Sequence, residues 1–416
     1  MVAALVVLAG CGNSSPSLSQ QPTSAPTPTV AVASPSEAPS ATATEAPTDT
    51  PEPTPGLVTI PTASVRSMAE GASVTFGSRV FAVANGRSTD RASITMRDFA
   101  STTSTVLVRT IAGHQIGGIA ATADRLIWVE TWRDHPSPPS NAVPGCVDVG
   151  KPLRWRVVAI LIASSGVQSV VASGTNLRTA FGGVCNDIDA PVMAADGDRV
   201  AYTLEAGTRT NPFANRIVVR SLATGAQIRS ITTVGIVQGL DLNGQAILYW
   251  DDLATPESTP YAVPFDGSLR LAAGDGTVPS LVDVHVSGAA LSGTRVGWIS
   301  ATATDGSVWT ESLTSGAKQQ LQVVDVADFH PDGASAIAVS NGTVAWIAQG
   351  EGSDSVGTSR LGLWTVGGIG PGILDQFGQA EFVGISGGWL AWDASTNGPD
   401  GQPSGLYGLP EAALVR

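Results

Sequence analysis

One serine has the sequence context of a hydrolase nucleophile, because Gly384-Ile-Ser386-Gly-Gly388 matches the pattern G-x-S-x-G. In that pattern the serine lies on a turn from a strand to a helix, and an acid and a histidine follow it in the chain. Here the segment lies between two predicted β-strands, and the last histidine, His330, precedes it. We therefore interpret Ser386 as a turn residue and assign no catalytic residue.

A second pattern, which begins at Asp393, is typical of the first half of a calcium loop. Asp393, Ser395 and Asn397 supply oxygen atoms at positions one, three and five, and a glycine follows at position six. Position twelve is Ser404, where such a loop needs a bidentate glutamate, and Pro399 interrupts the second half. The three residues are a weak calcium candidate. The histidines lack metal-ligand spacing, so we expect no metal and no cofactor.

Aromatic and acidic residues near the ends of predicted loops could contact a partner. An aromatic ring offers a large apolar surface at a binding face. If the fold encloses a central channel, as the repeats described below predict, carboxylates at its mouth could instead serve a carbohydrate-active lyase or hydrolase as acid and base. The candidate residues for the binding face are Trp132, Trp155, Asp187, Asp189, Trp250, Asp251 and Asp252.

The chain that must position these residues repeats one short phrase seven times, a Gly or Asp turn followed by an apolar run that ends near an aromatic residue. The copies follow one another at about 46–49 residues, apart from one interval of about 74. A period of this size indicates units that bury their apolar faces against each other. The copies are Gly77–Ala82, Ala123–Trp128, Gly197–Tyr202, Gly244–Tyr249, Gly293–Trp298, Asn341–Trp346 and Gly387–Trp392.

Each unit also contains alternating apolar runs joined by turns, as in residues 216–232 around Ala223-Thr-Gly225, which is typical of hairpins. The chain has 47 glycines, 27 prolines and only 14% charged residues, a composition that favours strands and turns. We predict an all-β fold, a seven-bladed β-propeller of four-stranded antiparallel blades over residues 57–416. Its core between blades is predicted to contain Trp128, Trp298, Trp346 and Trp392.

Long polar loops follow the second strand of most units, whereas the turns at the opposite ends of the blades are minimal. Insertions in repeat folds gather on the binding face, so we expect a partner to bind the loop-rich face. The alternative is that long polar loops are tolerated on this face and bind nothing. The long loops are residues 132–153, 205–215, 251–260, 349–360 and 394–404.

A closed ring needs a last strand that pairs the edge of the seventh blade. Leu57-Val-Thr-Ile60, just before the first copy, and residues 412–415 are the two candidates. We favour the N-terminal run.

The net charge of −13, with only two lysines, argues against nucleic acid and anionic membrane surfaces as partners. We expect a monomer whose partner is a protein, a peptide or a glycan.

The N-terminal residues have the composition of an anchored, exported protein. Apolar residues run up to Leu8-Ala-Gly-Cys11, which resembles the lipobox of bacterial lipoproteins. The resemblance implies a signal peptide and lipobox over residues 1–11 and a lipidated Cys11 as the mature N-terminus. Residues 12–56 are rich in Ser, Pro, Thr and Ala, which predicts a disordered linker. We therefore expect a domain that is lipid-anchored in the cell envelope, to the outer face of the cytoplasmic membrane or to an outer membrane, with the lipid as its only membrane contact.

The other two cysteines, Cys146 and Cys185, lie in the long interval, in predicted loops on the same face of two neighbouring units. An exported protein meets an oxidising environment, so the two are predicted to form a disulfide. The bridge would stabilise the fold by roughly 3–4 kcal/mol on the chain-entropy model. Two free thiols are the alternative.

The repeat itself resembles the blade of bacterial TolB-like and WD40-like propellers. The shared features are a turn followed by Arg-Val-Ala-Tyr202 or Thr-Val-Ala-Trp346, a strand such as Ile217–Leu222, and the turn Pro331-Asp-Gly333. The resemblance implies a propeller with a bias toward binding. An enzyme acting on carbohydrate and a scaffold for an envelope assembly are the alternatives.

Overall fold

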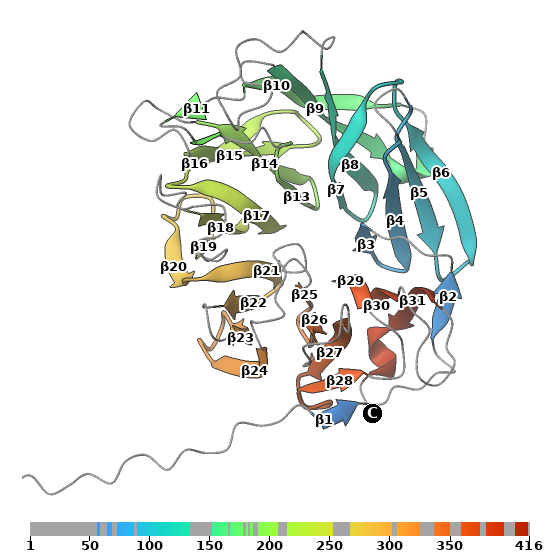
Figure 1. The fold of residues 1–416 in the computed structure, drawn as a ribbon, viewed down its shortest axis with the longest axis vertical. Helices are drawn as coiled ribbons and strands as arrows, with labels where there is room; N and C mark the ends of the chain where they lie inside the picture. The colour runs from blue at the N-terminus through green and yellow to red at the C-terminus, as the bar shows by residue number, and fades with distance from the viewer. Residues whose placement is uncertain are drawn as a thin grey trace, which may run out of the picture. The chain divides into compact units, whose positions relative to one another are not determined.

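Seven sheets, each with four antiparallel strands, form most of the described part of the chain, and they are arranged as the blades of a β-propeller (Figure 1). The computed structural model describes residues 56–58, 65–68, 73–86, 90–133, 152–164, 167–177, 180–181, 184–185, 190–206, 214–252, 267–301, 306–324, 337–349, 359–374, 380–394 and 404–414. All of them belong to one compact unit, Pro53–Arg416. The predicted fold class is confirmed.

Each blade is built from consecutive strands, the first of which lies innermost. Blade I contains β3 (Val74–Phe76), β4 (Arg79–Ala84), β5 (Ser93–Asp98) and β6 (Thr103–Arg109), and blade II contains β7 (Gln115–Ala121), β8 (Arg125–Trp132), β9 (Pro152–Leu161) and β10 (Ser169–Leu177). Blade III contains β13 (Met193–Asp196), β14 (Arg199–Glu205), β15 (Asn215–Ser221) and β16 (Gln227–Thr232), and blade IV contains β17 (Ile236–Asn243), β18 (Ala246–Asp252), β19 (Gly267–Ala272) and β20 (Ser280–Asp283).

The remaining blades follow the same order. Blade V contains β21 (Val286–Ser292), β22 (Arg295–Ala301), β23 (Gly306–Ser312) and β24 (Lys318–Val324), and blade VI contains β25 (Ile337–Val339), β26 (Thr343–Gln349), β27 (Ser359–Thr365) and β28 (Gly372–Leu374). Blade VII contains β29 (Ala380–Ser386), β30 (Trp389–Ala394) and β31 (Gly405–Pro410). Outside the blades are the hairpin of β11 (Ala180–Phe181) and β12 (Val184–Cys185) and the short 3-10 helices η2 (Ile162–Ser164) and η5 (Glu411–Ala413).

The N-terminal segment closes the ring, but not with the run that the sequence favoured. β2 (Arg66–Met68) pairs with β31 as the outermost strand of blade VII. Leu57 lies in β1 (Gly56–Val58), which pairs in parallel with β28 as a fifth strand of blade VI. The prediction of N-terminal closure is therefore confirmed, whereas its assignment to Leu57–Ile60 is wrong.

Glycine makes the turn from the first to the second strand of several blades tight. Gly77, Gly197, Gly244 and Gly293 have φ between 54° and 60°, and Gly387 has φ 52°. This left-handed conformation is strained for residues with a Cβ atom and costs glycine little. The segment after β29 leads through Gly387 and Gly388 into β30, a strand rather than a helix, and Ser386 is the last residue of β29, paired with Trp389, so it lies next to the turn and not in it.

Aromatic residues at the end of the repeated phrase fill the space between blades. Each of the four predicted core tryptophans, Trp128, Trp298, Trp346 and Trp392, has no exposed surface. Tyr202 and Tyr249 occupy the same position in blades III and IV and are 2% exposed. Full burial of one large apolar side chain stabilises a fold by roughly 1.5–3 kcal/mol, so this repeated position contributes strongly to the stability of the ring.

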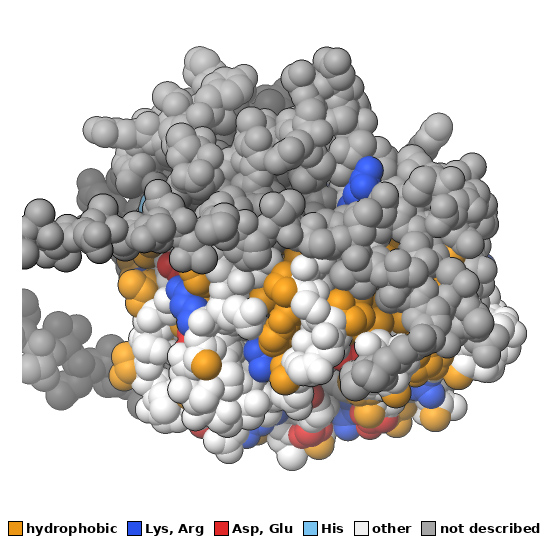
Figure 2. Space-filling model, turned by 90° about the horizontal axis from the view of Figure 1, so that it is seen from below, with side chains coloured by type: hydrophobic (Ala, Val, Ile, Leu, Met, Phe, Trp, Pro, Cys, Tyr) orange, Lys and Arg blue, Asp and Glu red, His pale blue; other side chains and the backbone are white. Residues whose placement is uncertain are grey.

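The strand order gives the ring two distinct faces. We call "loop face" the blade ends that carry the connections from second to third strands and from one blade to the next. The opposite "turn face" carries the short turns after the first and third strands. The side view in Figure 2 shows acidic, basic and apolar side chains interspersed among the described residues, without a basic patch on the side in view.

Candidate functional site

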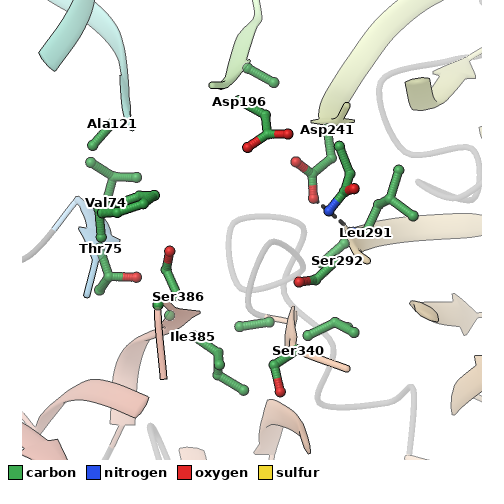
Figure 3. A pocket seen from close by; sticks show the side chains of 18 of the residues that line it. Val74, Thr75, Ala121, Asp196, Asp241, Leu291, Ser292, Ser340, Ile385 and Ser386 are labelled. Atoms are coloured by element: carbon green, nitrogen blue, oxygen red, sulfur yellow. Dashed lines mark hydrogen bonds between the residues drawn. The ribbon is translucent and has the colours of Figure 1, made fainter. Parts of the chain in front are cut away.

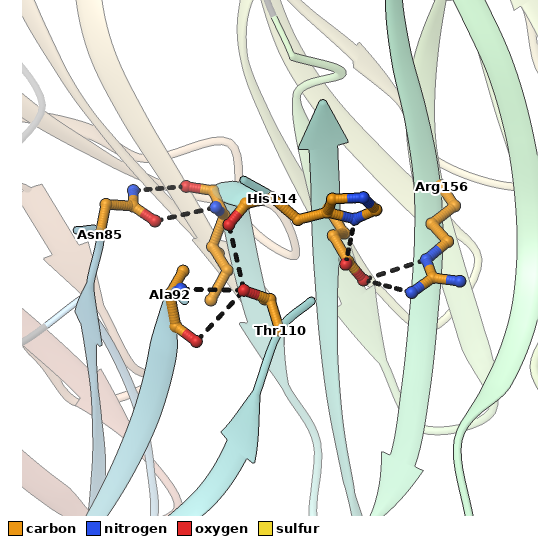
Figure 4. A network of polar contacts seen from close by, with 7 residues as sticks. Asn85, Ala92, Thr110, His114 and Arg156 are labelled. Carbon is orange, nitrogen blue, oxygen red and sulfur yellow. Dashed lines mark hydrogen bonds and ion pairs between the residues drawn. The ribbon is translucent and has the colours of Figure 1, made fainter. Parts of the chain in front are cut away.

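A buried carboxylate organises the loop face of blade II (Figure 4). Glu130 on β8 is 1% exposed, and its Oε2 accepts hydrogen bonds from Nε and Nη2 of Arg156 at 3.0 and 2.8 Å. Its Oε1 lies 2.6 Å from Nδ1 of His114. His114 ends the loop that enters blade II, so Glu130 fixes this loop to the second and third strands of the same blade.

Trp132, a predicted binding residue, belongs to this cluster. Its ring stacks on that of His114 with the centroids 4.7 Å apart and the planes 2° apart, and the Arg156 guanidinium lies 5.9 Å from the Trp132 ring centroid. The Trp132 side chain is half-buried. The loop face therefore carries an aromatic side chain in a fixed orientation, with two nitrogen-bearing side chains beside it.

The entry loop between blades I and II, residues 110–114, is also held from blade I. Thr110 Oγ1 accepts the backbone N–H of Ala92 at 2.8 Å and donates to the carbonyl of His114 at 3.0 Å. The side chain of Asn85 binds both the N–H and the carbonyl of Ile116, at 2.8 and 2.9 Å. These contacts leave Ile111 at the tip of the loop, where it is 57% exposed.

Asp251, another predicted binding residue, is the counterpart of Glu130 in blade IV. It is 1% exposed, and its Oδ2 accepts the backbone N–H groups of Val234 and Gly235 at 3.2 and 3.1 Å. Arg270 lies 3.5 Å from Oδ1. Burial, followed by the charge of Asp251, raises the pKa of Tyr249 to about 12. Asp251 therefore holds an entry loop and does not itself face a partner.

The entry loop of blade IV repeats the contacts of blade II. Thr233 Oγ1 accepts the N–H of Asn215 at 3.0 Å and donates to the carbonyl of Gly235 at 2.7 Å, as Thr110 does in its own loop. Val234 at the tip is 52% exposed. In the entry loop of blade V, Val284 is 42% exposed. The three entry loops that the structure describes in full thus each carry one large exposed aliphatic side chain on the loop face.

The other predicted tryptophans are part of the blades. Trp155 is 2% exposed, donates from Nε1 to Asn176 Oδ1 at 2.8 Å and pairs across strands with Gly174. Trp250 is half-buried and pairs with Gly239 in the same way. A Cβ on either glycine would overlap the indole ring, so these tryptophans cover a glycine on the neighbouring strand.

The remaining predicted residues are placed only in part. Asp252 is half-buried at the end of β18, and Asp393 of the calcium candidate is buried at 8% exposure. Cys185 contributes its backbone to β12. Outside the described residues lie Cys11, Cys146, Asp187, Asp189, Ser395 and Asn397. The disulfide and the calcium loop thus stay predictions.

A cavity of about 900 Å³ occupies the turn-face end of the central channel (Figure 3). It is lined by the last residues of the innermost strand of every blade, together with turn residues such as Gly387 and Gly388. Sequence reasoning missed this cavity because it favoured the opposite face. The volume is in the range of sites for small molecules, roughly 300–1,000 Å³.

Two carboxylates from neighbouring blades lie on one wall of this cavity. Oδ2 of Asp196 in blade III accepts the N–H of Gly244 at 2.6 Å. Asp241 in blade IV accepts the N–H of Leu242 at 2.8 Å through Oδ1 and that of Leu291 in blade V at 2.7 Å through Oδ2. Burial raises the pKa of Asp241 to about 6, and the nearby charge of Asp196 acts in the same direction.

The sequence does contain a signal for Asp241. The other six copies have Val74, Ala120, Ala194, Ala290, Ala338 and Gly384 three residues before the turn, where blade IV has this aspartate. Asp196 occupies a second position, one residue before the turn, where the other copies have an aromatic, a hydroxyl or an amide side chain. Alignment of the copies on their turns would have shown both carboxylates at the channel.

Within the described ranges, no group of three or more His, Cys, Asp or Glu side chains is arranged to hold a metal ion. No helix in this part of the chain combines the length and the apolar character needed to cross a membrane.

The comparisons with known proteins concern the fold. No family model matches the sequence, and no curated protein does. TolB from Acinetobacter baumannii is similar in structure over 80% of this chain, at 12% identity and a TM-score of 0.43, and the match spans 63% of the TolB chain. The β-propeller domain of the Trilobed protease from Pyrococcus furiosus matches 80% of this chain and 92% of its own, at 8% identity and a TM-score of 0.47. Oligogalacturonate lyase from Vibrio parahaemolyticus matches 84% of this chain and 92% of its own, at 9% identity and a TM-score of 0.46.

Proposed function

We propose that this protein is a binding module that recognises a protein, peptide or glycan partner through its loop face. The observation that carries the proposal is the way in which buried carboxylates hold the entry loops. Buried carboxylates at equivalent positions, Glu130 and Asp251, hold loops whose tips present Ile111 and Val234 to solvent. Preorganised loops lose little conformational entropy on binding, and the exposed Ile111 and Val234 side chains give these loops apolar contact area.

The charge of the chain restricts the class of partner. With a net charge of −13, nucleic acid and anionic lipid surfaces would be repelled. Trp132, half-buried beside His114 and Arg156, adds an amphipathic contact of the kind that dominates binding energy in protein interfaces. We propose that the protein acts as a monomer.

We also propose that the module is lipid-anchored in the cell envelope through Cys11, with residues 12–56 as a spacer. The support is the resemblance of Leu8-Ala-Gly-Cys11 to a lipobox, followed directly by a Pro/Ser/Thr-rich tract. A fatty-acid analogue should label the wild-type protein and leave Cys11→Ser unlabelled. A secreted, unlabelled wild type would contradict the anchor.

Photo-crosslinking tests the loop face directly. A photoreactive amino acid at position 111 or 234 should capture the same partner from envelope extract. At position 278, where Val278 is 86% exposed on the turn face of blade IV, the same amino acid should capture none. Val234→Asp should abolish capture by the probe at position 111, whereas Val278→Asp should not. Equal capture from all three positions would reject the loop face as the binding surface.

A carbohydrate-active lyase or hydrolase is the second candidate, and the channel supports it more than the loop face does. A carboxyl group with a pKa of about 6, Asp241, next to a second carboxylate, Asp196, has the properties of an acid and base pair. Turnover of an envelope polysaccharide that Asp196→Asn abolishes would establish the enzyme. Binding of that polysaccharide without turnover would favour the binding module.

A further inference from the structure

We propose that the turn-face cavity of the channel is a second binding site, which takes a small organic ammonium compound with an apolar group. The site lies at the end of the channel opposite the loop face, so it goes beyond the partner binding proposed above.

Hydrogen bonds to backbone N–H groups hold the two carboxylates of the site, Asp196 and Asp241, in fixed positions. Asp196 accepts the N–H of Gly244 in the first turn of blade IV at 2.6 Å, and Asp241 accepts the N–H groups of Leu242 and Leu291 on the inner strands of blades IV and V at 2.8 and 2.7 Å. A carboxylate can accept about four hydrogen bonds, so capacity remains on both after these contacts. Figure 3 shows the two carboxylate groups on the same side of the cavity, with Asp196 and Asp241 on neighbouring strands. A bound ammonium group could donate to both.

No cationic side chain balances these carboxylates within the cavity. The residues that line it include three acids, Asp196, Asp241 and Glu411, and no Lys, Arg or His. Glu411 is hydrogen-bonded to the hydroxyl of Ser340. The cavity is therefore an anionic recess, open at the mouth of the channel, in which a cation would gain more than at the flat surface, because the surrounding protein lowers the effective dielectric constant.

Apolar side chains face the carboxylates across the cavity, next to the hydroxyl groups of Thr75 and Ser386. The lining of blades I and VII includes Val74, Phe76, Phe382 and Ile385, and these blades lie across the ring from blades III and IV. Figure 3 shows Val74 and Ile385 on the far side of the cavity from Asp241. A ligand that fits both sides of the cavity has a cationic end and an apolar end. Aromatic side chains also attract cations directly.

The titration of Asp241 agrees with this assignment. Its pKa is raised to about 6 because the carboxylate is buried close to Asp196 without a cation. A bound ammonium group would favour the ionised carboxylate, so binding should strengthen as the pH rises from 5 to 7.

Calorimetric titration of the full-length protein with benzylamine tests the proposal, with benzyl alcohol as an uncharged ligand of nearly the same shape. Benzylamine should bind at least about ten-fold more tightly, since a hydrogen bond to a charged group is worth about 1.5–3 kcal/mol. Asp196→Asn, which keeps an acceptor for Gly244, should weaken benzylamine binding by a similar factor. Asp241→Asn is the second variant.

Asp124→Asn is the matched control, because Asp124 is a 63% exposed carboxylate in a turn-face turn outside the cavity. It should bind benzylamine like the wild type. Equal affinity for benzylamine and benzyl alcohol, absence of saturable binding, or wild-type affinity in both cavity variants would overturn the proposal. Val234→Asp on the loop face should leave benzylamine binding unchanged, so failure of either proposed site is distinguishable from failure of the other.

Discussion

The Asp241 carboxylate of blade IV accepts the backbone N–H of Leu291, on the innermost strand of blade V, at 2.7 Å. Innermost strands leave one edge of N–H and carbonyl groups facing the channel, and buried groups of this kind need partners. Other contacts between neighbouring blades are of the same kind: Asn85 and Asn215 accept the inner-strand N–H groups of Ile116 and Val237, and Asp196 and Asn341 accept the N–H groups of Gly244 and Thr294 in the turns that follow inner strands. Blades are thus joined by polar contacts at the channel as well as by the apolar core.

Asp241 should make the stability of the protein depend on pH. Its pKa is about 6 in the folded protein, against an ordinary value of 3.8, so the folded state binds the proton more tightly than the unfolded chain. The free energy of unfolding should therefore fall as the pH rises from about 4 to 6, by at most roughly 3 kcal/mol, and change little from this source above pH 7. Urea unfolding between pH 4 and 8 measures this.

The control for the pH effect is Asp241→Asn, which keeps one acceptor and cannot ionise. Its unfolding free energy should vary less between pH 4 and 6 than that of the wild type. An unchanged pH profile in this variant would assign the dependence to other groups.

Glu130 should be needed to hold the entry loop of blade II. Glu130→Gln leaves Arg156 and His114 without a carboxylate, and because both are partly exposed we expect a loss of about 1–3 kcal/mol in unfolding free energy. Hydrogen exchange should increase in residues 110–114 more than elsewhere. Asp124→Asn, at an exposed carboxylate of the same blade, should change stability by less than about 0.5 kcal/mol. Unaltered exchange in the loop would mean that Thr110 and Asn85 suffice.

Gly239 should not tolerate alanine, because its Cβ would lie 1.8 Å from Cζ2 of Trp250. Displacing a half-buried indole within a blade costs about 1–3 kcal/mol, so Gly239→Ala should lower the melting temperature clearly. A Cβ on Gly276, in the same blade, would meet open space, and the backbone there is not left-handed. Gly276→Ala should be neutral or slightly stabilising. Similar melting temperatures for both variants would show that Trp250 moves at little cost.

The fold could be predicted because a turn and an aromatic residue recur once in most blades. Both positions are determined by local requirements, the backbone conformation of the turn and the packing of the core. A left-handed turn favours glycine, as at Gly244, and a large ring fills the core between blades, as at Trp298. The closing strand was misassigned because Arg66–Met68 has no β-branched or alternating pattern, while Leu57–Ile60 does. Pairing with β31 is decided by tertiary contact, which a three-residue strand does not encode.

The candidate site was predicted less well, since loop position does not determine burial. Trp132 lies on the loop face as expected, but Trp155 and Asp251 lie at similar distances from loop ends and are buried. Alternation along a strand shows which residues share a face of the sheet; it does not show which of them a neighbouring blade covers. For the same reason, the strand pattern did not single out Asp196 and Asp241 as residues of the channel.

Cys146 and Cys185 are predicted to be joined, which peptide mapping under non-reducing conditions can establish. A peptide that contains both should be found in protein exported from the cell and disappear after reduction. The double variant Cys146→Ser and Cys185→Ser should lose roughly 3–4 kcal/mol, the value expected for closing a loop of about 39 residues. Quantitative labelling of both thiols in unreduced protein would exclude the bridge.

The two N-terminal strands should contribute unequally to stability, because they occupy different positions in the ring. A chain that begins at residue 60 lacks only β1, the fifth strand of blade VI, and leaves the four-stranded blades complete. A chain that begins at residue 70 also lacks β2 and Val65, so β31 becomes an open edge and a side chain packed on the core of blades VI and VII is lost. We expect the first truncation to cost about 1–2 kcal/mol and the second about 3–5 kcal/mol in unfolding free energy, from hydrogen bonds of about 1 kcal/mol each and the burial of Val65. The second chain should also associate in a concentration-dependent way, because an unpaired strand edge can pair with another copy. Light scattering and urea unfolding of the two chains measure both effects, and equal stability would mean that β2 does not close the ring.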